Sequence, residues 1–136
     1  MAIDDQLFAL WLVPPGALED PVGAFADLYT DPVTINGVPM PVSALVDRAC
    51  SLHEAFTDHE LEIVDRLETA TKLTVAFRHR ARHTGVWHTP LGDLPPTGRM
   101  VSGLGIDVLT ITPDDRIAEI WVLADELQRI LQIQAV

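Results

Sequence analysis

Residues 73–83 alternate between two kinds of side chain with a period of two, which is typical of a β-strand with one covered and one solvated face. The covered face would carry Leu73, Val75, Phe77, His79, Ala81 and His83, and the solvated face Thr74, Ala76, Arg78, Arg80 and Arg82. Alternation over residues 60–68 and apolar, β-branched runs at 99–112 and 116–126 predict three more strands, with a loop at 86–98. The C-terminal half of the sequence therefore predicts a sheet with one face buried against the rest of the protein.

The first half of the chain has a helical period instead. Helices are predicted over about 3–13 and 20–29, with Asp20 as the N-cap of the second. A third helix, over about 41–56, would bury the face formed by Val42, Leu45, Val46, Ala49, Leu52, His53 and Phe56. Residues 33–37 predict a short strand that ends in a turn. Helices followed by longer strands predict an α+β domain, in which an antiparallel sheet has the helices gathered on one face.

The composition restricts the partners of the protein. A chain of 136 residues fits one domain, 1–136, whose core is large enough to hold a ligand cavity. Its 20 Asp and Glu residues outnumber 9 Lys and Arg residues, and a net charge of -11 would repel nucleic acid and anionic membrane surfaces. No apolar stretch is long enough to span a bilayer, and Asp4 and Asp5 precede the apolar run at 7–13 where a signal peptide would be basic. We therefore expect a cytoplasmic protein.

Three histidines, His79, His83 and His88, are spaced by four and five residues, as some metal ligands are. In a strand, residues four apart are separated by about 13 Å, so one ion could not bridge them. The pair Gly103-x-Gly105 has no predicted helix after it, as a phosphate loop would require, and Cys50 has no base placed beside it. The sequence therefore predicts no metal, no cofactor and no covalent nucleophile.

Two aspartates are candidates for a reaction centre. Asp125 follows the run Ile120-Trp121-Val122-Leu123-Ala124, so we expect apolar surroundings to raise the pKa of its carboxyl and make it a proton-transfer base. The alternative is a solvated surface carboxylate that ends the last strand or bonds a nearby arginine. Asp107 stands between Ile106 and Val108 in a predicted strand. It is either a second acid of the same pocket or a paired structural residue.

Several short motifs along the chain, taken together, are typical of one known family. They are Asn36-Gly37, Phe56-x-Asp58, Arg82-His83-Thr84-Gly85, Leu94-Pro95-Pro96-Thr97-Gly98-Arg99, Gly105-Ile106-Asp107-Val108, Arg116-Ile117 and Trp121-x-x-x-Asp125-Glu126-Leu127. In this order the set resembles SnoaL-like polyketide cyclases, of the superfamily that resembles nuclear transport factor two. The resemblance implies a cone-like, curved sheet wrapped around a long helix and enclosing an apolar pocket. It also implies a homodimer or higher homo-oligomer.

The same resemblance implies a reaction. The family closes a ring by an intramolecular aldol addition without metal or cofactor, on an apolar substrate with several carbonyl groups, and its catalytic aspartate matches Asp125. A poorly hydrated carboxylate could remove the proton between two carbonyls, and neutral donors would stabilise the developing oxygen charge. Candidates for those donors are Asn36, His83 and the indole N–H of Trp87 or Trp121.

The remaining candidate residues are expected to line the substrate pocket, and some have a structural alternative. They are His53, which could instead be a hydrogen-bonded core histidine, Phe77 and Leu123. His83 shares the apolar face of its strand with Phe77, and it either lines the pocket or only packs in the core. Asn36 beside Gly37 is also the signal of a hairpin turn. Because one fold hosts many functions, other functions stay open. They are epoxide hydrolysis by two acids that position a water, isomerisation or dehydration of the steroid-isomerase type, and small-molecule binding without catalysis.

Overall fold

The computed structural model describes residues 2–134. Its helices are α1 (Ile3–Leu12), α2 (Pro21–Leu28), α3 (Val42–Ala55) and α4 (Glu126–Gln134), with a 3-10 turn, η1, at Pro15–Ala17. Its strands are β1 (Tyr29–Ile35), β2 (Val38–Met40), β3 (Phe56–Glu68), β4 (Lys72–His83), β5 (Trp87–Thr89), β6 (Gly92–Leu94), β7 (Met100–Ile111) and β8 (Ile117–Ala124). None of these helices combines the length and the apolar character needed to cross a membrane.

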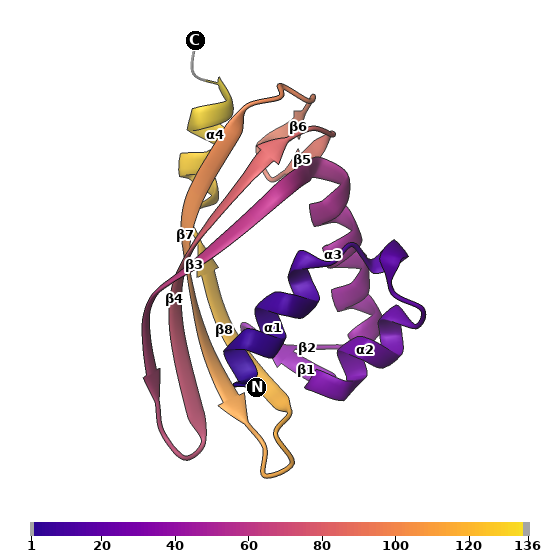
Figure 1. Cartoon of the computed structure of the whole chain (residues 1–136), viewed down its shortest axis with the longest axis vertical. Helices are drawn as coiled ribbons and strands as arrows, with labels where there is room; N and C mark the ends of the chain where they lie inside the picture. Colours follow the sequence, from indigo (N-terminus) through magenta and orange to yellow (C-terminus); the bar gives the residue numbers. More distant parts are fainter. Residues whose placement is uncertain (1, 135–136) are drawn as a thin grey trace.

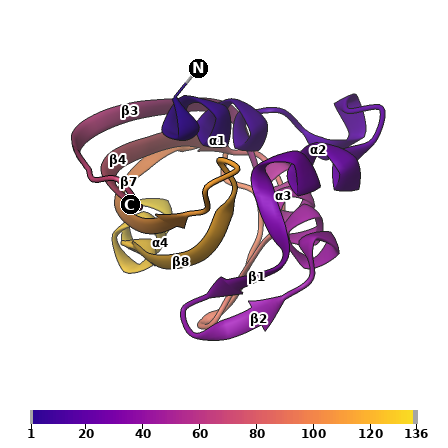
Figure 2. The same cartoon turned by 90° about the horizontal axis from the view of Figure 1, so that it is seen from below.

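Six strands form one curved sheet in the order β2-β1-β8-β7-β4-β3, and β5 pairs with β6 in a separate hairpin. Neighbours in the large sheet are antiparallel, except that β1 and β8 run parallel. The sheet curves without closing, and α1 and α3 face its concave side (Figure 1 and Figure 2). This confirms the predicted α+β, cone-like fold, except that β1 and β8 form a parallel pair in a sheet that was predicted to be antiparallel.

The helices of the first half pack their apolar faces toward the sheet. Asp20 caps α2 as predicted, because its Oδ1 accepts the backbone N–H of Gly23 at 3.0 Å. The buried face of α3 carries Val42, Leu45 and Ala49. These residues join aromatic side chains of α2 and β1, and apolar side chains of β4, β7 and β8, in one core.

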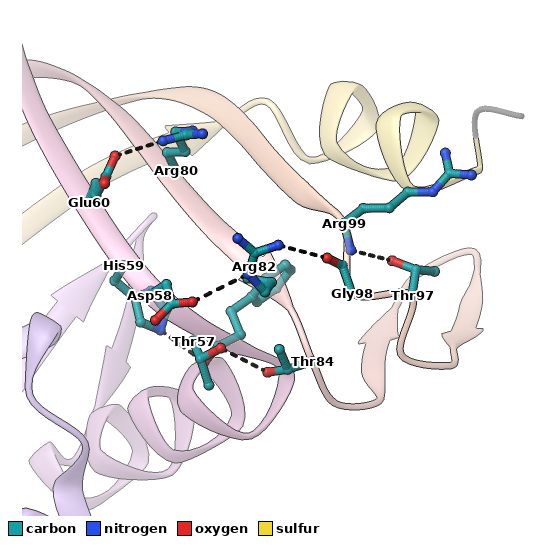
Figure 3. A network of polar contacts seen from close by, with 11 residues as sticks. Thr57, Asp58, His59, Glu60, Arg80, Arg82, Thr84, Thr97, Gly98 and Arg99 are labelled. Carbon is teal, nitrogen blue, oxygen red and sulfur yellow. Dashed lines mark hydrogen bonds and ion pairs between the residues drawn. The ribbon is translucent and has the colours of Figure 1, made fainter.

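The alternation predicted for β4 is confirmed, and the arginines of its outer face are paired. Ion pairs with β3 join Arg78 to Glu62 at 3.3 Å, Arg80 to Glu60 at 3.1 Å and Arg82 to Asp58 at 3.3 Å. Figure 3 shows the last two, together with the hydrogen bond that Arg82 donates to the carbonyl of Gly98 at 3.0 Å. All of these groups are exposed, so each pair contributes about 1 kcal/mol or less. The opposite face of β4 carries the buried side chains and points toward the helices.

Three segments differ from the prediction, and the first is β2, because no strand was predicted at Val38–Met40. The loop predicted at 86–98 contains the short hairpin of β5 and β6. The last strand ends at Ala124, and α4 follows it. This helix forms because the Oδ1 of Asp125 accepts the backbone N–H of Gln128 at 3.1 Å, and because Ile130 and Ile133 are buried on one side of it.

Candidate functional site

A cavity of about 270 Å³ lies between the concave face of the sheet and the helices α1, α3 and α4. Its wall is mostly apolar, with a few polar groups, as ligand pockets commonly are. The lining residues are Leu7, Phe8, Trp11, Leu12, Tyr29, Ile35, Leu45, Arg48, Leu52, His59, Leu61, Phe77, His79, Asp107, Ile120, Val122, Ala124 and Arg129. The apolar pocket expected from the sequence is therefore present.

Asp107 supplies the carboxyl group among these lining residues. Because side chains alternate along β7, Gly103, Gly105 and Asp107 face the cavity, whereas Leu104 and Ile106 face outward. Asp107 is 8% exposed, and burial raises the pKa of its carboxyl from 3.8 to about 6. A carboxyl with this pKa is ionised at neutral pH and is a stronger base than an ordinary aspartate.

Tyr29, at the start of β1, places a phenol against the same cavity. The indole N–H of Trp11 donates to its hydroxyl oxygen at 2.7 Å, and Tyr29 is only 1% exposed. Burial raises the pKa of the Tyr29 phenol well above its ordinary value, and the charge of Asp107 raises it further. The phenol therefore stays protonated. Since its oxygen already accepts a hydrogen bond, its own O–H is left to donate.

Two histidines and one arginine form a hydrogen-bonded chain in the cavity wall. The Nη2 of Arg129 lies 2.9 Å from the Nδ1 of His79, and the Nε2 of His79 lies 2.9 Å from the Nδ1 of His59. The Nε2 of His59 in turn lies 3.0 Å from the carbonyl oxygen of Phe56. The imidazole rings of His59 and His79 are stacked, with centroids 5.1 Å apart.

The direction of every bond in this chain follows from its two ends. A guanidinium only donates and a carbonyl only accepts, so each imidazole must accept at Nδ1 and donate from Nε2. Both rings are therefore neutral. Burial, followed by the positive charge of Arg129, lowers the pKa of His79 to about 3. Burial also lowers the pKa of His59, and the charge of His53 lowers it further.

The acid and the arginine lie at different ends of the cavity. In the β4–β7 register, Val75 is opposite Asp107, Phe77 is opposite Gly105 and His79 is opposite Gly103. A Cβ on Gly105 would come within 2.4 Å of the Phe77 ring, so this glycine leaves room for the ring above β7. The cavity thus has an acid end with Asp107 and Tyr29, an aromatic middle, and a cationic end with Arg129.

The predicted apolar environment of Asp125 is wrong. Its carboxyl is exposed and caps α4, and the cavity is lined by the preceding residue, Ala124. The reason is the alternation of side chains along β8. Ile120, Val122 and Ala124 point into the cavity, so Asp125, the next residue, points outward.

The same alternation places two further predicted substrate-binding residues outside the cavity. Trp121 is 49% exposed and its indole N–H donates to Glu119 at 3.2 Å, while Leu123 is 79% exposed. Asn36 matches the alternative of a turn residue, because its φ is 50°, in the left-handed region. Its side-chain amide makes two hydrogen bonds with the backbone of β8. The amide N–H donates to the carbonyl of Val122 at 3.2 Å, and its oxygen accepts the N–H of Val122 at 2.8 Å.

Phe77 and His53 are placed differently with respect to the cavity. Phe77 lines it, with its ring centroid 5.2 Å from that of Phe8. His53 is half-buried behind the wall, where its Nε2 lies 2.7 Å from the carbonyl oxygen of Trp11. It matches the alternative of a hydrogen-bonded core histidine.

His83 and Trp87 belong to a second cluster at the other end of β4. His83 is fully buried, its Nδ1 lies 3.0 Å from the hydroxyl of Thr97, and its ring packs on Phe56 at 5.5 Å. Trp87 packs on the same Phe56 at 5.2 Å and lines a second cavity of about 360 Å³. Neither residue lines the main cavity.

The three spaced histidines have separate partners, which are Arg129 for His79, Thr97 for His83 and Asp93 for His88. Within residues 2–134, no group of three His, Cys, Asp or Glu side chains is arranged to hold a metal ion.

Several cavity residues were not predicted from the sequence. Trp11 belongs to a correctly predicted helix, whereas Tyr29, which was predicted to end a helix, begins β1. Nothing local indicates that the two side chains would meet. Arg129 lies on the helix that was missed, although the capping residue Asp125 and the spacing of Ile130 and Ile133 could have indicated it. Asp107, in contrast, was one of the two predicted acids, and it is the one that lines the cavity.

Comparison with known proteins agrees with this architecture. The model of the SnoaL-like polyketide cyclase family matches residues 12–133. A SnoaL-like polyketide cyclase from Agrobacterium tumefaciens is 18% identical with a TM-score of 0.73, over 98% of each chain. TsrD from Streptomyces laurentii is 19% identical with a TM-score of 0.73, over 98% of this chain and 96% of TsrD. At such identities these structures show a shared fold.

The search of curated protein sequences finds no match to this chain. The family model, in contrast, covers most of the 136 residues and spans the helices, the sheet and the cavity. The chain therefore belongs to the SnoaL-like polyketide cyclase family.

Proposed function

We propose that the protein closes a ring in a polyketide-like substrate by an intramolecular aldol addition in which Asp107 is the general base. One observation carries the proposal, which is that the cavity holds a buried carboxyl whose pKa is raised to about 6. A base with a pKa near the working pH is largely ionised and still accepts a proton readily. Membership of the family supports the reaction class, and the location of Asp107 supports the choice of base.

The proposed reaction needs only groups of the chain and of the substrate. The Asp107 carboxylate takes a proton from the carbon between two carbonyls, and the C–H electron pair forms an enolate. The enolate carbon attacks a second carbonyl of the same molecule, forming the new C–C bond while the carbonyl π pair moves onto oxygen. That oxygen takes the proton back from Asp107. The O–H of Tyr29 is suited to donate to the developing oxygen charge, since Trp11 already occupies its acceptor side.

The apolar wall contributes by holding the two reacting carbons together. A flexible substrate with several carbonyls has many conformations in water, and few of them bring the reacting carbons into contact. Confinement between Phe8, Phe77 and Leu61 would reduce this freedom and exclude water from the enolate. This effect is separate from proton transfer, so a variant without the base should still bind.

The substitution Asp107→Asn tests the base. We expect it to lower the rate by about 100- to 10,000-fold while ligand binding is retained, because Asn fills the same space but does not accept the proton. The measurement is deuterium uptake from D2O at the central carbon of an aryl 1,3-diketone, followed by proton NMR and corrected for the uncatalysed rate. The wild-type rate should rise with pH through about 6, the pKa of Asp107.

Asp125→Asn is the matched comparison, because Asp125 is the aspartate expected from the family motif and it lies outside the cavity. We expect its rate to stay within about threefold of wild type, since Asn is as good a helix cap as Asp. Loss of activity in Asp125→Asn with full activity in Asp107→Asn would assign the base to Asp125 and overturn the proposal.

An isomerase on the same fold is the second candidate, and it is favoured because Asp107 and Tyr29 line the same cavity and the charge of Asp107 acts on the phenol. A carboxylate base beside a phenol donor also suits the movement of a double bond next to a carbonyl. The products separate the two reactions, because ring closure forms a C–C bond and isomerisation does not. Epoxide hydrolysis by two acids is not favoured, since Asp125 is exposed outside the cavity.

We also propose that two copies of the chain associate through the outer face of β7 and β8. Four large apolar side chains lie exposed there, namely Leu104, Ile106, Trp121 and Leu123. The register places Ile106 opposite Leu123, so they form one patch. Association of two copies at this patch would remove the four side chains from water, which favours pairing there.

A further inference from the structure

Two arginines border the main cavity at the end away from Asp107. Arg48 comes from α3 and Arg129 from α4, and both also line the second cavity. The two cavities therefore share a boundary that carries positive charge. This is unusual in a chain whose acidic residues outnumber its basic ones by 20 to 9.

Arg129 is a buried cation whose donors are mostly unused. It is 6% exposed, and a guanidinium has five N–H donors. One hydrogen bond, from Nη2 to His79, is made within residues 2–134. His79 and His59 are neutral in this chain, so they hold the guanidinium in place without balancing its charge. Glu126 and Asp125 offset part of this charge, and an anionic ligand that accepts hydrogen bonds from the remaining N–H groups would stabilise it further.

Arg48 extends the positive boundary toward solvent. It is exposed, and in the part of the chain that the structure describes it has no ion-pair partner, unlike the arginine row of β4. Three acids lie on the same side of the molecule. The carboxylate of Glu126 lies 3.7 Å from the Nη1 of Arg129 and is itself half-exposed. Asp47 lines the second cavity. The charge of Asp125, just before α4, interacts favourably with that of Arg129. None of these three lines the main cavity.

The distance between the two ends follows from β7. The side chain of Arg129 lies over Gly103, where a Cβ would come within 2.7 Å of its Nε. Gly103 is four residues from Asp107 on the same face, which is about 13 Å along the strand. Phe77 lies between them, opposite Gly105. A ligand that reaches both ends must therefore be elongated, with an apolar middle.

We propose that the substrate carries a free carboxylate, which binds between Arg129 and Arg48 while its reacting dicarbonyl carbon lies at Asp107. This rests on the proposed function for the site of reaction, but not for the binding of the carboxylate. The ligand class is an elongated acid whose carboxylate is about 13 Å from the reacting carbon, with an apolar or aromatic portion between them. Arg129 is the main contact, since its unused donors line the apolar cavity, and Arg48 is the outer one.

The test compares an acid with its neutral ester. The probes are 6-(2-naphthyl)hexanoate and its methyl ester, with binding followed by naphthyl fluorescence at pH 7.5. We expect the wild-type protein to bind the acid at least tenfold more tightly than the ester. Arg129→Gln should weaken binding of the acid by about 10- to 100-fold, as expected for the loss of hydrogen bonds between charged groups, and leave the ester within threefold.

Two variants guard against a folding artefact. Arg48→Gln changes an exposed side chain, so it should fold normally and weaken acid binding by about three- to tenfold. Arg80→Gln is the control, because it removes the same charge from an exposed ion pair on the outer face of the sheet, and it should leave the affinity for both probes unchanged. Circular dichroism checks that each variant is folded.

The outcomes separate this inference from the proposed reaction. Asp107→Asn should bind the acid as tightly as the wild type whether or not Asp107 is the base. Equal affinity of the wild type for acid and ester, or equal loss in Arg48→Gln and Arg80→Gln, would overturn the carboxylate subsite and leave the assignment of the base untouched. Loss of catalysis with intact acid binding supports both.

Discussion

Asp107 and Asp125 show how strongly the surroundings decide what a carboxyl can do. Both stand at or beside strands rich in apolar residues, so the local sequence makes them look alike. Asp107 points into the cavity, where burial raises its pKa to about 6. Asp125 points to solvent and accepts a backbone N–H of α4. The first arrangement suits proton transfer, and the second stabilises a helix.

The raised pKa of Asp107 predicts a pH-dependent gain in stability for Asp107→Asn. The folded protein holds the proton more tightly than the unfolded chain, whose aspartate has a pKa of about 3.8, so ionisation of Asp107 destabilises the fold as pH rises from about 4 to 6 and by a constant amount above that. Removing the charge should therefore stabilise the protein at pH 8 by up to about 3 kcal/mol relative to its effect at pH 4. Urea denaturation of both proteins at several pH values measures this difference.

The comparison for that experiment is Asp125→Asn, which removes one charge from an exposed position. A difference for Asp107→Asn that does not vary with pH, or that varies only as much as the difference for Asp125→Asn, would mean that the Asp107 carboxyl is hydrated in the folded protein.

At the level of elements, the sequence predicts strands and helices better than their orientation. The alternation in β4 and the apolar face of α3 identify both elements and their buried sides, because burial repeats with the period of the backbone. β8 was predicted, but its inward residues were not, since nearly every position from Ile117 to Ala124 is apolar and either face could be the covered one. The chain between Arg129, His79 and His59 joins three elements, and no local pattern specifies such a meeting.

The missed helix α4 gives a prediction for its cap. Asp125→Ala removes the oxygen that accepts the N–H of Gln128, and should lower the free energy of unfolding by about 1 kcal/mol. Asp125→Asn keeps an acceptor and should cost much less. Hydrogen exchange of the α4 amides, measured by NMR, should be faster in the alanine variant only. Equal protection in all three proteins would show that packing of Ile130 and Ile133 alone holds the helix.

At the scale of the whole molecule, the outer sheet face decides how copies of the chain meet. Leu123→Lys places a charge in the proposed dimer patch, where desolvation of the ammonium would oppose association. We expect sedimentation analysis to show a dimer for the wild type and at least tenfold weaker association for this variant.

The control for association is Leu91→Lys. Leu91 is 74% exposed, similar to Leu123, but it lies in the turn between β5 and β6, away from the patch. This variant should associate as the wild type does. Equal weakening in both variants would indicate a general effect of charge, and a monomeric wild type would refute the dimer.

During synthesis, β1 cannot pair with β8 until the ribosome has released β8. Asn36 and Val122, which are joined by two hydrogen bonds, are 86 residues apart, so the ribosome releases one long before the other. Until the later strand arrives, the helices that precede it have no complete surface to cover. Contacts between residues so far apart in the sequence form slowly, so the apolar lining of the cavity is among the last parts of the fold to form. The growing polypeptide is therefore most vulnerable to aggregation just before its final strand emerges.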